Sequence, residues 1–219
     1  MASASTSALL FKDATIIVFA KAPEPGKVKT RLTTQLSPEQ AANLHQQLAL
    51  RTLHMATQTL LARVELWCAP NSTHPFFQHC QKKYSLTLHE QVGDDLGQRM
   101  HHAIDNVLTR SKYCLIIGTD CPELSHQHLE DTFSSLRDAH NCVITPATDG
   151  GYVMLGLTQS NPMLFTDIKW GNDSVYEATI ARLKSLSWHW QSKTALNDID
   201  RPSDLTLLQG IDLPAPLSF

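Results

Sequence analysis

The sequence predicts an α/β fold, a three-layer α/β/α sandwich with a mostly parallel mixed sheet. Short apolar runs of strand length alternate along the chain with longer segments of helical periodicity. Residues 114–117 (CLII) form an unbroken apolar run, as expected of a strand that is buried on both faces of a parallel sheet. The 219 residues are enough for one sizeable hydrophobic core.

Composition and charge indicate a single domain in a reducing cytoplasm. We expect residues 1–13 to form a flexible tail and residues 14–219 to form one domain, because no linker divides the chain. The five cysteines are odd in number and never spaced as CxxC, which argues against disulfides and structural zinc. The eleven histidines are scattered, and we interpret most of them as ordinary side chains. A net charge of −3 without a basic block argues against nucleic acid as a partner, and no apolar run has the length of a membrane span.

The first strand is expected at residues 15–20, and a cationic loop follows it. Two prolines and a glycine, Gly26, lie within four residues of this loop and exclude regular structure. Its cations are Lys21, Lys27, Lys29 and Arg31. Four like charges in so short a loop repel one another unless an anion lies among them, so we favour an anion site over a solvated basic turn.

A helix is expected next, followed by two strands. Ser37, Pro38 and Gln40 form a capping-box pattern, and the helix should run to about Arg63. The second strand is expected at residues 64–69. In order after it, we expect a short helix within 72–84 and a third strand at 86–91.

The segment 91–100 (QVGDDLGQRM) predicts a turn that opens another helix. Gly93 and Gly97 would allow a ligand to approach the backbone, and Arg99 would point into the same cleft. Capping of the helix by one of the two acids is the simpler interpretation, and we favour it.

Asp120 follows the central strand, where open α/β sheets bind their ligands. A carboxylate at this position could hold Mg²⁺ or Mn²⁺, cations that often take one or two protein carboxylates and complete their coordination with nucleotide phosphates. The alternative is that Asp120 caps the helix expected at residues 125–139. The two interpretations are evenly balanced.

Asp149, Gly150 and Gly151 lie between strands expected at residues 142–146 and 153–157. An acid followed by two glycines suits a substrate that lies directly against the backbone. A plain Asp-Gly hairpin turn is the alternative.

The last part of the chain contains a loop, a helix, an edge strand and a closing turn. Asn172 or Asp173 is expected to cap the helix, and residues 187–191 are expected to form the edge strand. In the closing turn, Asp200 or Arg201 would cap a helix that begins with a proline, or an acid there would be a second metal ligand.

Three segments together resemble a known family: FAKAPEPGKVKTRL, GTDCPEL and TPATDGGYVMLGL, supported by GDDLGQRM and DIDRPSDL. They resemble the small bacterial glycosyltransferase-like proteins that are associated with radical-SAM and selenodomain proteins and linked to arsenosugar biosynthesis. That family has the GT-A (nucleotide-diphospho-sugar transferase) fold, and the match spans roughly residues 15–208. The layout is more distantly similar to the molybdenum-cofactor and 2-phospholactate nucleotidyltransferases.

The resemblance implies roles for individual residues and a bound Mg²⁺ or Mn²⁺. By position it implies phosphate contacts from Lys21, Gly26, Lys29 and Arg31, base or ribose contacts near Gly97 and Arg99, acceptor contacts from Gly150 and Gly151 with Asp149 as a base, and metal binding by Asp120 together with Asp200 or Asp198. The chain departs from the DxD pattern of glycosyltransferases, because GTDCP holds a single acid.

The expected function is metal-dependent group transfer from a nucleotide-activated donor. Glycosyl transfer from a nucleotide-diphospho-sugar to a small-molecule acceptor is favoured. The alternative is a nucleotidyltransferase that moves a nucleoside monophosphate to a small acceptor and releases pyrophosphate. A homodimer is compatible with either reaction.

Overall fold

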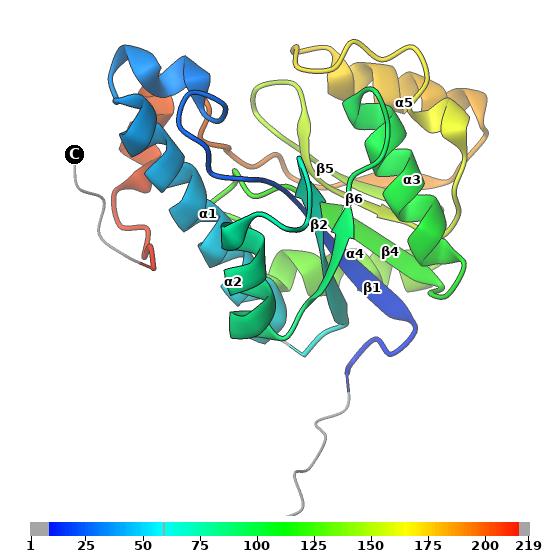
Figure 1. Ribbon diagram of the computed structural model, residues 1–219. Coiled ribbons are helices and arrows are strands. Elements are labelled where there is room, and N and C mark those ends of the chain that lie inside the picture. The colour runs from blue at the N-terminus through cyan, green and yellow to red at the C-terminus, as the bar shows by residue number, and fades with distance from the viewer. Residues whose placement is uncertain (1–8, 59, 215–219) are drawn as a thin grey trace, which may run out of the picture.

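A mixed sheet forms the centre of the computed structural model, which describes residues 9–58 and 60–214 (Figure 1). Within these residues the sheet has seven strands in the order β3-β2-β1-β4-β6-β5-β7. The strands are β1 (Ala14–Lys21), β2 (Arg63–Ala69), β3 (Thr87–Glu90), β4 (Tyr113–Ile117), β5 (Cys142–Pro146), β6 (Tyr152–Leu157) and β7 (Trp190–Ser192). The α-helices are α1 (Pro38–Gln58), α2 (Pro75–Tyr84), α3 (Leu96–Leu108), α4 (His126–Arg137) and α5 (Val175–Ser185), and the 3₁₀ helices are η1 (Thr30–Thr34), η2 (Pro162–Leu164) and η3 (Pro202–Leu208).

The pairing pattern confirms the predicted mostly parallel sheet. Strand β1 pairs in parallel with β2 and β4, β2 pairs in parallel with β3, and β5 pairs in parallel with β7. Strand β6 is antiparallel to both β4 and β5, which makes the sheet mixed. The carboxyl ends of β1, β4 and β5 therefore share one edge of the sheet, the edge at which open α/β sheets bind ligands.

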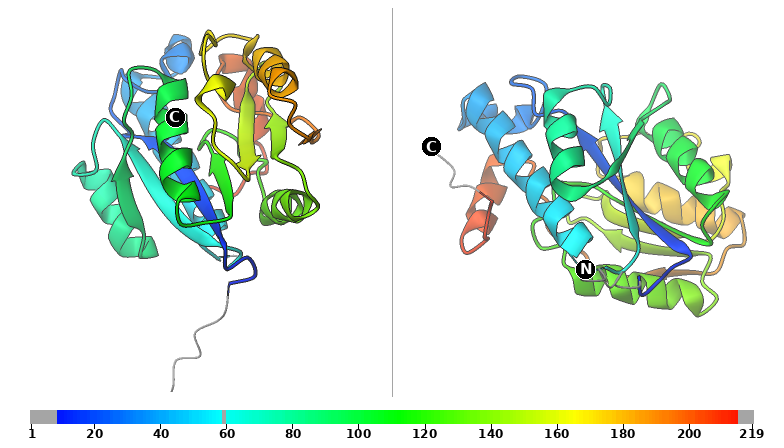
Figure 2. Two further views of the ribbon diagram at one scale, coloured as in Figure 1. Left: turned by 90° about the vertical axis from the view of Figure 1, so that its right-hand side faces the viewer. Right: turned by 60° about the horizontal axis from the view of Figure 1, so that its bottom comes forward.

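Helices cover both faces of the sheet and complete the three layers (Figures 1 and 2). Helices α1, α2 and α4 pack on one face, in a core that contains Leu53, Phe77 and Phe133. Helices α3 and α5 pack on the other face, in a core that contains Ile104 and Leu183. A smaller apolar cluster joins η1, α1 and η3, and so fixes the end of the chain beside the first loop.

Several predicted boundaries were wrong for local reasons. Helix α1 ends at Gln58, before the predicted Arg63, because the carbonyl groups of Leu60 and Leu61 accept hydrogen bonds from Leu10 and Phe11 and the chain turns into β2. The edge strand begins at Trp190 because Ser187 and Trp188 still belong to the turn that ends α5: their amides donate to the carbonyl groups of Lys184 and Leu183.

One helix cap, the closing helix and the start of the described chain also differ from the predictions. The N-cap of α5 is Ser174, and not Asn172 or Asp173 as predicted. The side-chain oxygen of Asn172 accepts hydrogen bonds from the backbone amide and the hydroxyl group of Ser174. The closing helix is a 3₁₀ helix without buried residues. Of the predicted tail, residues 1–8 lie outside the described residues, whereas Phe11 is buried against Phe133 and belongs to the core. No helix in the described part of the chain has the length and apolar character that a membrane span requires.

A buried ion pair joins β2 to the end of α3. Glu65 is 2% exposed, and its carboxylate accepts two hydrogen bonds from the Arg110 guanidinium, at 2.6 and 2.9 Å. The ring of His89 lies 3.2 Å from the same carboxylate, but burial lowers the pKa of His89. Arg110 is therefore the partner that compensates the buried charge.

Replacement of Arg110 by methionine should destabilise the protein by about 3 kcal/mol, because the charge on Glu65 would remain buried without its cation. Urea denaturation measures this loss. The control is Arg182→Met, whose partner Asp167 has an 82% exposed side chain, and which should change stability by about 0.5 kcal/mol or less. Equal losses in the two variants would contradict the analysis.

Candidate functional site

A cavity of about 540 Å³ opens at the carboxyl edge of the sheet. It brings together the loop after β1, the residues after β4, the turn between β5 and β6, and the segment before η3. Seven predicted site residues line it: Lys21, Lys29, Arg31, Asp120, Asp149, Gly151 and Asp200. Asp198, the alternative to Asp200, lines it as well, whereas Gly26, Gly97, Arg99 and Gly150 are absent from its wall.

Lys29 and Asp120 form the base of this cavity. The side chain of Lys29 is 3% exposed, and its ammonium group lies 2.8 Å from Oδ1 of Asp120. The same ammonium donates a hydrogen bond to the carbonyl of Ile199, and the Ile199 amide donates to the carbonyl of Asp120 at 2.9 Å. Lys29 has a left-handed backbone (φ 50°), which is uncommon for a residue with a side chain and directs its side chain inward. Three distant parts of the chain are joined by these contacts.

His45 is a member of this cluster that the sequence analysis missed. Its Nε2 lies 3.0 Å from the carbonyl oxygen of Lys21, and its Nδ1 lies 3.6 Å from Oδ1 of Asp120. His45 is 5% exposed and lines the cavity. A signal was available, because His45 stands four residues from both Ala41 and Ala49 on the apolar side of α1, where a polar residue needs a partner.

Arg31 connects the loop to two other segments at the mouth of the cavity. Its guanidinium forms an ion pair with Asp200 and donates a hydrogen bond to the carbonyl of Gly171 at 3.3 Å. The pair raises the pKa of Arg31, chiefly through the hydrogen bond to Asp200. Arg31 and Asp200 thus neutralise each other in this structure.

Asp198 and Asp149 supply negative charge to the other side of the cavity. Burial, together with the nearby charges of Asp149 and Asp120, raises the pKa of Asp198 to about 6. The Oδ1 atom of Asp149 accepts a hydrogen bond from the Gly151 amide at 2.9 Å, which fixes the carboxylate in the turn. Neither carboxylate has a cationic side chain within ion-pair distance among the described residues.

A divalent cation fits this arrangement through Asp120 and Asp198. No three His, Cys, Asp or Glu side chains in the described ranges gather closely enough to hold a metal ion by themselves. Asp120 is ion-paired through Oδ1, but its side chain is 46% exposed, while the pKa of Asp198 is raised first by burial and then by the negative charges of Asp149 and Asp120, which a bound cation would offset. Asp200 fits less well, because Arg31 already occupies its Oδ2. Phosphate oxygens of a substrate would have to complete the coordination.

Apolar and aromatic side chains also line the cavity. They are those of Trp170, Met100, Leu96 and Tyr152. The indole of Trp170 lies directly on Gly97, where an added Cβ would stand 2.6 Å from the ring. Gly97 therefore makes room for Trp170 and does not itself line the cavity.

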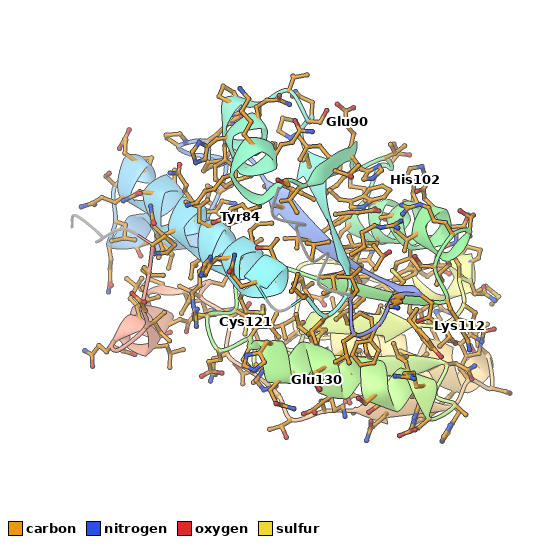
Figure 3. The ribbon with its side chains drawn as sticks, turned by 90° about the horizontal axis from the view of Figure 1, so that it is seen from below. Tyr84, Glu90, His102, Lys112, Cys121 and Glu130 are labelled. Atoms are coloured by element: carbon orange, nitrogen blue, oxygen red, sulfur yellow. The ribbon has the colours of Figure 1, made fainter. Side chains whose placement is uncertain are left out.

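Gly150 has a similar packing role in the turn. A Cβ on Gly150 would stand 2.1 Å from the carbonyl oxygen of Asp173, and its positive φ of 93° favours glycine. Gly26 also has a positive φ, but a Cβ added there would meet no atom within 4 Å. Cys121 also lines the cavity, and Figure 3 shows it between α1 and α4; burial raises the pKa of its thiol to about 12.

Replacing Lys29 with methionine should destabilise the protein by about 2 kcal/mol, because Asp120 would lose its partner while remaining partly solvated by the cavity. The matched control is Lys27→Met in the same loop. Lys27 has a 74% exposed side chain paired with Glu24, so about 0.5 kcal/mol or less is expected. Chemical denaturation of both variants gives the comparison. A loss for Lys29→Met no larger than that for Lys27→Met would show that the Lys29 contacts do not stabilise the fold.

Comparison with solved structures confirms the predicted fold. A "putative nucleotide-diphospho-sugar transferase" from Desulfovibrio desulfuricans G20 is 27% identical to this chain, with a TM-score of 0.82 over 90% of this chain and 87% of that one. A cytidylyltransferase from Leptospira borgpetersenii serovar Hardjo-bovis is 12% identical, with a TM-score of 0.60 over 90% and 85% of the two chains. A 4-diphosphocytidyl-2C-methyl-D-erythritol synthase from Anaerococcus prevotii is 11% identical, with a TM-score of 0.59 over 91% and 97%. The last two show the shared fold alone.

Comparison with sequences identifies the family. No curated protein matches the chain. Residues 52–172 match the model of a family described as "Uncharacterized protein conserved in bacteria (DUF2064)". This match includes β2 to β6, Asp120 and Asp149, and it spans more than half of the sequence. The chain therefore belongs to the DUF2064 family of proteins conserved in bacteria.

Proposed function

We propose that the protein transfers a glycosyl group from a nucleotide-diphospho-sugar to a small-molecule acceptor. The observation that carries this proposal is the convergence of the cationic loop after β1, Asp120 and Asp149 on one cavity at the carboxyl edge of the sheet. The likeness to the Desulfovibrio protein supports a nucleotide sugar as donor. The resemblance to transferases linked to arsenosugar biosynthesis supports a small acceptor.

In this reaction Asp149 acts as the base. The hydrogen bond from Gly151 holds Oδ1 of Asp149, and the other carboxylate oxygen accepts the proton of the acceptor hydroxyl. The acceptor oxygen bonds to the sugar carbon as the bond between that carbon and the diphosphate oxygen breaks. Trp170 and Tyr152 border the same cavity and give this part of the site an aromatic surface.

Asp120 and Asp198 would hold Mg²⁺ or Mn²⁺ beside the diphosphate. When bound, the cation would neutralise charge that develops on the departing nucleoside diphosphate. Lys29 keeps Asp120 in place from the buried side. Arg31 would be shared between Asp200 and the phosphates.

Nucleotidyl transfer remains a second candidate because the second acid of a DxD pattern is missing. Pro122 stands at its position, two residues after Asp120, and the neighbouring Cys121 is no anionic ligand, because burial raises the pKa of its thiol to about 12. In that reaction the acceptor oxygen attacks the α-phosphorus of a nucleoside triphosphate, and pyrophosphate leaves.

Replacing Asp149 with asparagine should lower kcat for glycosyl transfer by roughly 100-fold or more, because the base would be lost, while donor affinity should change by about twofold or less. The rate of nucleoside diphosphate release measures kcat, and titration with the donor measures its affinity. Asp138→Asn on the surface is the control. Release of pyrophosphate from a triphosphate by the wild-type protein would reject glycosyl transfer and support the second candidate.

Replacing Asp198 or Asp120 with asparagine should weaken nucleotide binding in the presence of Mn²⁺ by roughly tenfold, because one carboxylate ligand would be lost. Without a divalent cation the difference from wild type should disappear. Calorimetric titration of a nucleoside diphosphate with and without Mn²⁺ makes the comparison, and Asp94→Asn serves as control. Unchanged affinity and unchanged Mn²⁺ dependence in both variants would contradict the metal site.

A further inference from the structure

A second cavity of about 310 Å³ adjoins the first at the carboxyl ends of β1 and β2. The two cavities share Lys21, Lys27, Val28 and Gln91 in their walls. Arg99 lines the second cavity but not the first. A ligand could therefore extend from one cavity into the other.

The cations of the predicted phosphate loop are paired in this structure, with one exception. Lys29 is neutralised by Asp120, Arg31 by Asp200, and Lys27 by Glu24. Lys21 has no carboxylate within ion-pair distance in the described ranges. The same holds for Arg99. The unneutralised positive charge of the site therefore lies in the second cavity and not at the base of the first.

Arg99 is placed where its charge opposes the stability of the fold. It stands in the first turn of α3, where the helix dipole is positive and a cation is unfavourable. Its Nε donates a hydrogen bond to the Gly93 carbonyl at 2.8 Å, which fixes the side chain, and both terminal nitrogens have no hydrogen-bond partner among the residues that the structure describes. A fixed guanidinium with two free terminal nitrogens is suited to bind phosphate through paired hydrogen bonds.

Gln91 gives the second cavity a rigid boundary. Its amide nitrogen donates hydrogen bonds to the carbonyl groups of Ala20 and Trp67, at 3.2 and 2.9 Å. Its backbone amide also bonds to the carbonyl of Cys68. These bonds fix the ends of β1 and β2 beside Arg99, so the second cavity is built on the sheet as well as on the loop.

We propose that the second cavity is an anion-binding subsite that takes a phosphate group between Lys21 and Arg99. This inference deepens the proposed function, since the phosphate would belong either to the nucleotide donor or to a separate phosphorylated compound. Charge complementarity supports phosphate over a neutral group, because the two unpaired cations remain without compensation until an anion binds.

Titration of inorganic pyrophosphate into the protein at low ionic strength tests the subsite without any turnover. Lys21→Met and Arg99→Met should each weaken pyrophosphate binding by about tenfold, the effect of one charge-assisted hydrogen bond. Lys82→Met, an exposed cation on α2, is the matched control and should leave binding unchanged. Replacing Arg99 also removes its bond to the Gly93 carbonyl and could loosen that turn. The Lys21 side chain makes no hydrogen bond to any described residue, so Lys21→Met tests the subsite without this complication.

The outcomes separate this inference from the proposed function. Absence of pyrophosphate binding by the wild-type protein, or wild-type affinity in both Lys21→Met and Arg99→Met, would overturn the subsite. Weakened binding in these variants supports it, even where no glycosyl transfer is found. A nucleoside diphosphate that competes with pyrophosphate assigns the subsite to the donor, whereas simultaneous binding of both assigns it to a separate compound.

Discussion

The contacts of the Lys29 ammonium hold the candidate site together. A buried ammonium group is stable only when its hydrogen bonds and its charge are satisfied, and here Asp120 and the Ile199 carbonyl satisfy them. The loop after β1, the end of β4 and the segment before η3 must therefore meet at one point. Ile199 also anchors the small apolar cluster between η1, α1 and η3. The position of Asp200, and with it the partner of Arg31, follows from these contacts.

The same contacts determine how charge is distributed over the two cavities. In the middle of the site, ion pairs neutralise the charges of Lys29 and Arg31. Positive charge therefore remains at Lys21 and Arg99, and negative charge remains at Asp149 and Asp198. A loop that reads as strongly cationic in sequence is thus nearly neutral where it meets the central strand. Such a separation of charge orients a ligand that carries an anion at one end.

Much of the fold was predictable because its signals are local. The capping box of Ser37 and Gln40 and the apolar run of β4 depend on neighbours in sequence, and both are present in the structure. The site depends on distant partners and was predictable only in part. The sequence placed Asp120 and Arg31 at one edge of the sheet, but the covering of Gly97 by Trp170 joins residues 73 positions apart, which no local pattern reports.

The distribution of charge also bears on which reaction the fold performs, a question that fold likeness alone does not answer. A phosphorylated acceptor, one of the two kinds that nucleotidyl transfer could use, would have to approach the carboxylate of Asp149, which repels it and has no cationic partner among the described residues. A neutral hydroxyl acceptor meets no such repulsion. A donor with its phosphates towards Lys21 and Arg99 would extend past Lys21 into the first cavity, whose wall includes Asp149. We therefore favour glycosyl transfer to an uncharged acceptor.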